Sequence, residues 1–254
     1  MEADPRRGAP GVSVQACAEI VAAGDADRFA AAMTAPVEDR DALFPLYAFN
    51  LEIAKAPWLT SEPMIAQMRL QFWRDVLDEV QEGKKARAHE VVEPLAAAIR
   101  ARGIPLAPLH QMIDARQVDI EREPFDGPAA LWHYLETTAG ALMVASMGAL
   151  GHRAPDQARV LGRAQGLAAF IAAQDDLEAH GWRAVQSDML PGMVETALGD
   201  LSPLPKRFGM ATPAARAAWR TRARLEALKA GKPAVESEFA RRTSLVVKTV
   251  LRRW

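Results

Sequence analysis

The chain has 254 residues, of which 50% are apolar and 25% are charged, and its formal net charge at pH 7 is only −1. This length fits one large helical domain or at most two small ones. Cys17 is the single cysteine, which excludes an internal disulfide and favours a reducing compartment.

Helical signals dominate the chain, whereas no run alternates apolar and polar residues between Asn-Gly or Asp-Gly turns. We expect residues 1–11, which are charged and rich in proline and glycine, to be disordered. This start resembles neither a secretory signal nor a good transit peptide. The longest apolar run, residues 139–151, has about half of the roughly 20 residues that a membrane span needs, so we expect a buried helix there.

A helical domain is predicted over residues 12–205, because apolar residues recur there at three- and four-residue steps between proline starts and glycine stops. Pro36 opens a helical hairpin whose main part, residues 41–80, organises the rest. The expected helices cover residues 12–23, a segment from about 25, two segments within 41–80, and residues 91–102, 105–120, 126–150, 156–178 and 187–200.

The second helix of the hairpin contains the motif RLQFWRD next to an apolar stripe. We expect this helix to be half-buried through an apolar stripe that consists of Met64, Ile65, Met68, Phe72, Val76 and Val80. Arg69, Trp73 and Arg74 interleave cations with an aromatic ring, which makes them candidates for contact with a partner. A solvated charged face above a buried stripe is the alternative, and it stays open.

Residues 206–254 form a basic helical C-terminal segment, with 13 Lys/Arg against 3 Asp/Glu. From Pro213 the sequence predicts two basic helices that are broken at residues 231–233. The last helix is amphipathic, and its cations are candidates for binding an anionic membrane surface: Arg241, Arg242, Lys248, Arg252 and Arg253. Docking on the acidic body of the same molecule is the alternative. Nucleic acid is not an expected partner, since aromatic stacking platforms are absent.

Four sequence motifs resemble those of a known family: LYAFNLEIAKAP, RLQFWRDVLDEV, IDARQVDIEREPF and YLETTAGAL. With the order of the helices, they make residues 12–205 similar to the squalene/phytoene synthase superfamily. Within it, AFNLEIA followed by RLQFWRD looks more like the branch of the mitochondrial complex I assembly factor and its bacterial relatives. The resemblance implies an all-α, isoprenoid synthase-like helical bundle.

A working synthase of this family must neutralise a departing diphosphate. Mg²⁺ does so, and it prefers carboxylate oxygens in near-octahedral geometry. Helices supply these oxygens as aspartate pairs four residues apart, which lie on one face. The resemblance places the first pair on Ala54 and Trp58, and the phosphate-binding arginine on Leu51. No carboxylate remains at these positions.

The second aspartate pair is also missing. The resemblance places its two aspartates on Ala173 and Leu177, and the accompanying asparagine on Ala169. We therefore expect no catalytic residue, no cofactor and no metal. An apolar cavity is implied to remain, and the candidates to line it are Tyr47, Asn50, Glu52, Asp114, Tyr134 and Phe170.

The missing carboxylates predict a non-catalytic family member that binds a protein partner or a prenyl lipid. The resemblance implies that it helps to assemble a respiratory complex at the membrane. The expected location is cytoplasmic, and peripheral attachment to the inner membrane stays open. The alternative is an active prenyl transferase, of the head-to-head condensing type, that holds Mg²⁺ through displaced carboxylates. Those carboxylates would be Glu52, Asp114, Asp175 and Asp176. The residues that line the cavity decide between the two hypotheses.

Overall fold

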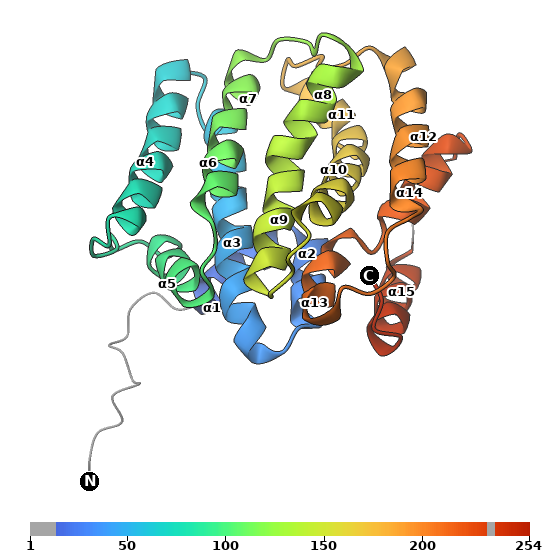
Figure 1. Cartoon of the computed structure of the whole chain (residues 1–254). Coiled ribbons are helices and arrows are strands. Elements are labelled where there is room, and N and C mark those ends of the chain that lie inside the picture. The colour runs from blue at the N-terminus through green and yellow to red at the C-terminus, as the bar shows by residue number, and fades with distance from the viewer. Residues whose placement is uncertain (1–13, 233–236) are drawn as a thin grey trace.

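The computed structural model describes residues 14–232 and 237–254, and every regular element in these ranges is helical (Figure 1). This confirms the predicted all-α class, while residues 1–11 lie outside the described ranges. The first elements are α1 (Val14–Gly24), α2 (Ala26–Met33), α3 (Val37–Lys55), η1 (Ala56–Trp58), α4 (Pro63–Gln81), α5 (Val92–Arg102), α6 (Leu106–Ala115), α7 (Gln117–Glu121), α8 (Gly127–Leu135), η2 (Glu136–Gly140) and α9 (Ala141–Ala149).

The second half of the chain continues the bundle and ends in a small helix beside it (Figure 1). Its elements are α10 (Pro155–Ala172), α11 (Gln174–Ala179), η3 (Ser187–Met189), α12 (Leu190–Leu201), η4 (Gly209–Ala211), α13 (Thr212–Ala215), η5 (Arg216–Ala218), α14 (Thr221–Lys229) and α15 (Glu238–Val250). The starts and stops follow ordinary capping rules. Asp25 caps α2 by accepting a hydrogen bond from the Arg28 amide, and α5 ends at Gly103 in the left-handed region.

Three predicted helices are interrupted, and each interruption adjoins the cavity described below. The helix expected over residues 105–120 divides at Arg116 into α6 and α7, and that expected over 156–178 divides at Ala173 into α10 and α11. The helix expected over 126–150 contains the π-helical turn η2. Such turns are frequent at functional sites because they reorient side chains within a helix.

The turn η2 packs very closely against α10. Ideal methyl positions on Gly162 would lie 2.5 Å from the Ala139 carbonyl oxygen and 2.7 Å from Met143 Cβ. A methyl on Gly166 would lie 2.7 Å from Ala139 Cβ. Only glycine fits at both positions, so these two residues set the distance between the helices.

Helix α4 lies at the edge of the bundle, and its buried face agrees with the predicted stripe only at Val76 and Val80 (Figure 1). Met64 and Met68 are 72% and 67% exposed, and Phe72 is only partly buried. The core face instead follows Ala66, Leu70, Trp73 and Leu77, which also satisfies helical spacing. An edge helix has one covered face, and here Trp73 rather than the methionines occupies it.

The basic segment 206–254 packs against the body of the bundle. The Trp254 ring donates a hydrogen bond to the Pro205 carbonyl over 2.7 Å and is 9% exposed. Arg216 donates to the Thr34 hydroxyl over 2.8 Å, which ties η5 to the end of α2. The division at residue 205 stays a prediction from composition.

The close approach of η2 and α10 predicts that Gly162→Ala is strongly destabilising. The added methyl meets backbone atoms that cannot move aside, and overpacking of this kind costs about 1–3 kcal/mol of unfolding free energy. Urea unfolding followed by tryptophan fluorescence measures the change. Gly199→Ala in α12 is the matched control, since nothing lies within 4 Å of its methyl position. Alanine also has the higher helix propensity, so equal losses in the two variants would contradict the packing argument.

Candidate functional site

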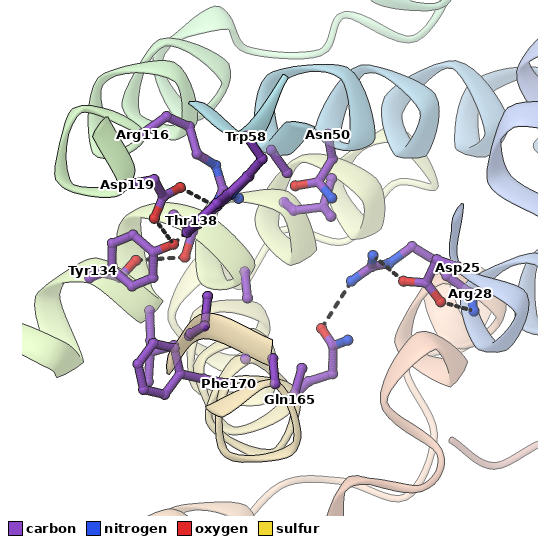
Figure 2. A pocket seen from close by; sticks show the side chains of 18 of the residues that line it. Asp25, Arg28, Asn50, Trp58, Arg116, Asp119, Tyr134, Thr138, Gln165 and Phe170 are labelled. Atoms are coloured by element: carbon purple, nitrogen blue, oxygen red, sulfur yellow. Dashed lines mark hydrogen bonds and ion pairs between the residues drawn. The ribbon is translucent and has the colours of Figure 1, made fainter. Parts of the chain in front are cut away.

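The main candidate site is a cavity of about 290 Å³ in the centre of the bundle (Figure 2). It lies among α3, the break between α6 and α7, the segment from α8 to α9, and the break between α10 and α11. Most of its wall is apolar, and two separate groups of polar side chains face each other across it (Figure 2).

Five of the six degenerate motif positions line this cavity. Ala54 and Trp58 reach it from the end of α3 and from η1. Ala169, Ala173 and Leu177 reach it from the other side, on α10 and α11. Apolar side chains thus meet across the cavity where the resemblance places the carboxylates of a synthase.

Leu51, the sixth position, does not line the cavity. Its side chain lies against Gly24, where a methyl group would come within 2.8 Å of Leu51 Cδ1. The position implied to bind phosphate therefore serves the packing of α3 on the end of α1.

One polar group of the cavity joins Arg116, Asp119 and Tyr134 (Figure 2). Arg116 Nη1 donates to Asp119 Oδ2 over 2.9 Å and to the Tyr134 hydroxyl over 3.0 Å, and that hydroxyl donates to Asp119 Oδ1 over 2.7 Å. Burial and the Asp119 carboxylate raise the pKa of Tyr134, which therefore keeps its proton. Burial alone would lower the pKa of Arg116, but Tyr134 and Asp119 hold it above its ordinary value.

The second polar group joins Asp25, Arg28 and Gln165 (Figure 2). Arg28 Nη1 lies 2.6 Å from Asp25 Oδ2, and Arg28 Nη2 donates to Gln165 Oε1 over 3.2 Å. The guanidinium also stacks over Tyr47, with 5.3 Å between the Arg28 Cζ atom and the ring centroid. Arg28 is 7% exposed and forms a fixed part of the cavity wall.

Asn50, Tyr134 and Phe170 line the cavity as predicted, but the sequence analysis missed both arginines. The spacing of each arginine from an aspartate could have indicated these pairs. Each arginine stands three residues from its aspartate, Asp25 before Arg28 and Asp119 after Arg116, and such pairs can meet on one helix face.

A family model described as squalene/phytoene synthase matches residues 21–182, more than half of the chain. The chain belongs to the squalene/phytoene synthase family. All residues that line the cavity fall within the matched range, and α12 to α15 fall outside it.

Curated relatives of this squalene/phytoene synthase family member are named NADH dehydrogenase (ubiquinone) complex I, assembly factor 6. The protein of Bos taurus is 28% identical over 160 residues, and that of Homo sapiens is 26% identical over 160 residues. Each match covers 62% of this chain and 48% of the relative. The homologue of Drosophila melanogaster is 30% identical over 172 residues, covering 63% of this chain and 50% of that protein. The chain spans about half the length of the curated relatives it matches.

Solved structures of synthases share the fold. A dehydrosqualene synthase in complex with ligand superposes with a TM-score of 0.76 at 17% identity, covering 94% of this chain and 96% of that one. A squalene synthase from Alicyclobacillus acidocaldarius gives a TM-score of 0.62 at 16% identity, covering 94% and 89%. At these identities the likeness confirms the predicted isoprenoid synthase-like bundle and leaves the activity to be argued from the site.

The residues of the cavity do not fit the magnesium cluster that the family fold implies. Its carboxylates are Asp25 and Asp119, and each is already paired with an arginine. Among the described residues, no group of three His, Cys, Asp or Glu side chains could hold a metal ion. Asp175 and Asp176, the alternative metal ligands, are exposed, and neither lines this cavity.

Three predicted cavity residues lie elsewhere. Tyr47 is buried beneath Arg28, where burial raises its pKa to about 12, and Glu52 is partly exposed outside the cavity. Asp114 accepts a hydrogen bond from Arg74 and lines a second cavity of about 590 Å³ on the far side of Tyr134. The break at Arg116 explains this exchange, because it turns Asp119, not Asp114, towards the main cavity.

The three residues of α4 that were predicted to contact a partner differ in their exposure and pairing. Trp73 is 4% exposed and packs edge-on against Phe49 at 5.4 Å between ring centroids, so its ring is not available to a partner. Arg74 is ion-paired with Asp114 over 2.9 Å. Arg69 is exposed, and it lies near the same end of α4 as the exposed Met64 and Met68.

Helix α15 docks on the body through its polar face. Arg241 Nη1 pairs with Asp27 over 2.8 Å, and Lys248 Nζ donates to the Trp254 carbonyl over 2.9 Å. These two cations, predicted to bind a membrane, are therefore engaged within the molecule. The opposite face is apolar and points to solvent, with Phe239, Val246 and Val250 at least 60% exposed. No helix in the described ranges has the length and apolar character needed to cross a membrane.

Asp27 is the anchor of α15. It also pairs with Arg220 and Arg224, each over 2.7 Å. Burial alone would raise the pKa of Asp27, but hydrogen bonds and charges from Arg220, Arg224 and Arg241 hold it below its ordinary value. Because the folded pKa is lowered, this stabilisation is complete above the ordinary aspartate value of about 3.9 and is lost as the pH falls through the folded value.

We predict that Asp27→Asn lowers the unfolding free energy at pH 7 by about 2 kcal/mol, since charged hydrogen bonds are replaced by neutral ones. The gap between wild type and variant should shrink as the pH falls from about 5 to about 3. Urea unfolding at each pH measures both effects. Asp175→Asn, at an exposed carboxylate, is the control. A loss that is independent of pH would contradict this role of the Asp27 charge.

Proposed function

We propose that the protein is a non-catalytic member of the squalene/phytoene synthase family that acts as an assembly factor for a respiratory complex. One observation carries the first half of this proposal. Ala54, Trp58, Ala173 and Leu177 line the cavity where the family pattern requires metal-binding carboxylates.

The chemistry of diphosphate departure supports the same conclusion. A leaving diphosphate concentrates negative charge that Mg²⁺ must neutralise, and a carboxylate cluster must hold that metal. The carboxylates that remain, Asp25 and Asp119, are bound to Arg28 and Arg116 and face each other from separate groups. The described residues that line the cavity therefore include no carboxylate cluster that could hold the metal needed to ionise a prenyl diphosphate.

The displaced-carboxylate alternative finds little support in the geometry. Asp114 pairs with Arg74 and borders the second cavity, whereas Asp175 and Asp176 are exposed. Glu52 does not line the main cavity. A prenyl transferase would therefore need a substantial rearrangement to bring these oxygens together.

The assembly role is supported by the curated relatives, which are named as complex I assembly factors. Since this chain spans about half of each relative, the role is carried over as a proposal. A protein partner would find Arg69, Met64 and Met68 exposed together on α4. Methionine side chains adapt readily to a partner surface.

Attachment to an anionic membrane surface would use the outer face of α15. Phe239, Val246 and Val250 stand at seven- and four-residue steps, which align them on one side of the helix. The flanking Arg252 is exposed, as is Arg242, which pairs with Glu238 over 2.7 Å, and each cation near an anionic bilayer contributes about 1 kcal/mol. We propose that this face holds the protein at the membrane where a respiratory complex is assembled.

The first experiment is calorimetric titration with farnesyl and geranylgeranyl diphosphate, with and without Mg²⁺, and product analysis on the same samples. We predict no magnesium-dependent binding and no condensation product. A dehydrosqualene synthase titrated in parallel is the positive control. Metal-dependent binding with turnover would refute the non-catalytic half of the proposal and favour the prenyl transferase.

A second experiment tests the role at the membrane in cells that lack the protein. The wild-type chain should restore assembled NADH dehydrogenase on native gels and co-purify with membranes. The variant Phe239→Ser/Val246→Ser/Val250→Ser should lose about fivefold or more of its membrane-bound fraction and restore assembly poorly.

Val37→Ser, which removes an exposed apolar side chain at the start of α3, is the control for that variant. Normal assembly by the α15 variant would contradict the proposed membrane role. Normal assembly in cells without any copy of the chain would contradict the assembly role itself.

A further inference from the structure

The charges that line the main cavity cancel. Its charged side chains are two aspartates and two arginines, joined as Asp25 with Arg28 and as Asp119 with Arg116. The pairing atoms are 2.6 Å and 2.9 Å apart, so neither arginine offers an uncompensated charge. An anionic ligand would meet guanidinium groups whose charge a carboxylate in the wall already balances.

Two side-chain amides in the cavity retain unused hydrogen-bonding capacity. Asn50 makes no side-chain hydrogen bond within the described part of the chain. Gln165 uses its oxygen to accept from Arg28, which leaves its NH2 group free. Both amides lie beside apolar wall and can donate to an oxygen atom (Figure 2).

We infer that this cavity binds a neutral ligand with an apolar chain and an oxygen that accepts a hydrogen bond from the Asn50 amide, and that it disfavours the same chain bearing a diphosphate. An isoprenoid alcohol and a prenylated quinone share this chemistry. The inference rests on the proposed function and names the ligand class for the same site.

Electrostatics gives the direction of this selectivity. A diphosphate in the cavity lies near the carboxylates of Asp25 and Asp119, and like charges repel strongly at low dielectric. The charges of the two arginines offset this repulsion only in part, because each guanidinium is already ion-paired with one of these carboxylates. A neutral oxygen loses little hydration on entry and recovers a hydrogen bond from an amide.

The apolar wall fits the rest of such a ligand. Trp58, Phe170 and Trp182 border the space, with small side chains such as Ala54 and Ala169 between them. A volume of about 290 Å³ is near the lower end of the range for ligand sites, so it suits a polar end and the first part of a chain.

Titration of the full chain with farnesol and with farnesyl diphosphate tests the inference, because the two probes share one chain and differ in the head group. Trp58 and Trp182 line the cavity, so tryptophan fluorescence reports binding beside calorimetry. We expect farnesol to bind at least about tenfold more tightly, with no effect of Mg²⁺. A short-chain prenylated quinone is the third probe, and its affinity relative to farnesol identifies the preferred head group.

Two variants test which residues cause the preference for farnesol over farnesyl diphosphate. Asp25→Asn removes one negative charge yet retains a good helix cap for α2, so it should raise the affinity for farnesyl diphosphate roughly tenfold and leave farnesol within about twofold. Asn50→Leu should weaken farnesol roughly fivefold through loss of one hydrogen bond. Asp175→Asn, outside the cavity, should change neither affinity.

The outcomes separate this inference from the proposed function. Equal or tighter binding of farnesyl diphosphate without turnover, or no binding of any probe, overturns the inference and leaves a non-catalytic protein. Binding of the diphosphate with Mg²⁺ and product formation overturns both. Tighter binding of either neutral probe, lost in Asn50→Leu, supports the inference.

Discussion

The close approach of η2 to α10 determines where the other walls of the cavity stand. Gly162 and Gly166 let the two segments meet almost backbone to backbone. This contact fixes the direction of α10, whose last turn then carries Ala169 and Ala173 towards the end of α3. The π-helical geometry of η2 also leaves Thr138 and Tyr134 facing the same space. Packing of small residues thus sets the frame on which the polar groups are placed.

Within this frame, the chain keeps the family's fold, while apolar side chains stand at the positions where the family resemblance places metal-binding carboxylates. Synthases and this chain share the bundle, but the functional properties of a fold reside in the side chains of its site. Here two Asp–Arg pairs occupy opposite ends of the cavity, and in each pair the two charges balance. Such pairs cost desolvation energy, and they persist where geometry supplies further partners, as Tyr134 and Gln165 do.

The sequence was sufficient for the fold class, most helices and the loss of the motif carboxylates. Periodicity and the four family motifs are local signals, and they transfer directly to the bundle. It was insufficient for Arg28 and Arg116, since arginines at three-residue spacing from an aspartate are common on solvated surfaces. It misplaced Met64 and Trp73 because two different stripes of α4 satisfy helical spacing, and only the neighbouring helices decide which is covered. Asp119 lines the main cavity in place of the predicted Asp114 because of a helix break at Arg116, which periodicity does not reveal.

The composition of the cavity wall has a consequence for regulation. Histidine is the side chain whose charge ordinarily changes between pH 5 and 8, and none stands among the described residues that line the space. Tyr134, with its raised pKa, stays protonated far above neutrality. Shifts in cellular acidity would therefore leave the charge state of this site unaltered. A cell that controls how much ligand occupies the cavity would have to do so through ligand supply or through the outer helices. Cellular pH would not serve as the control.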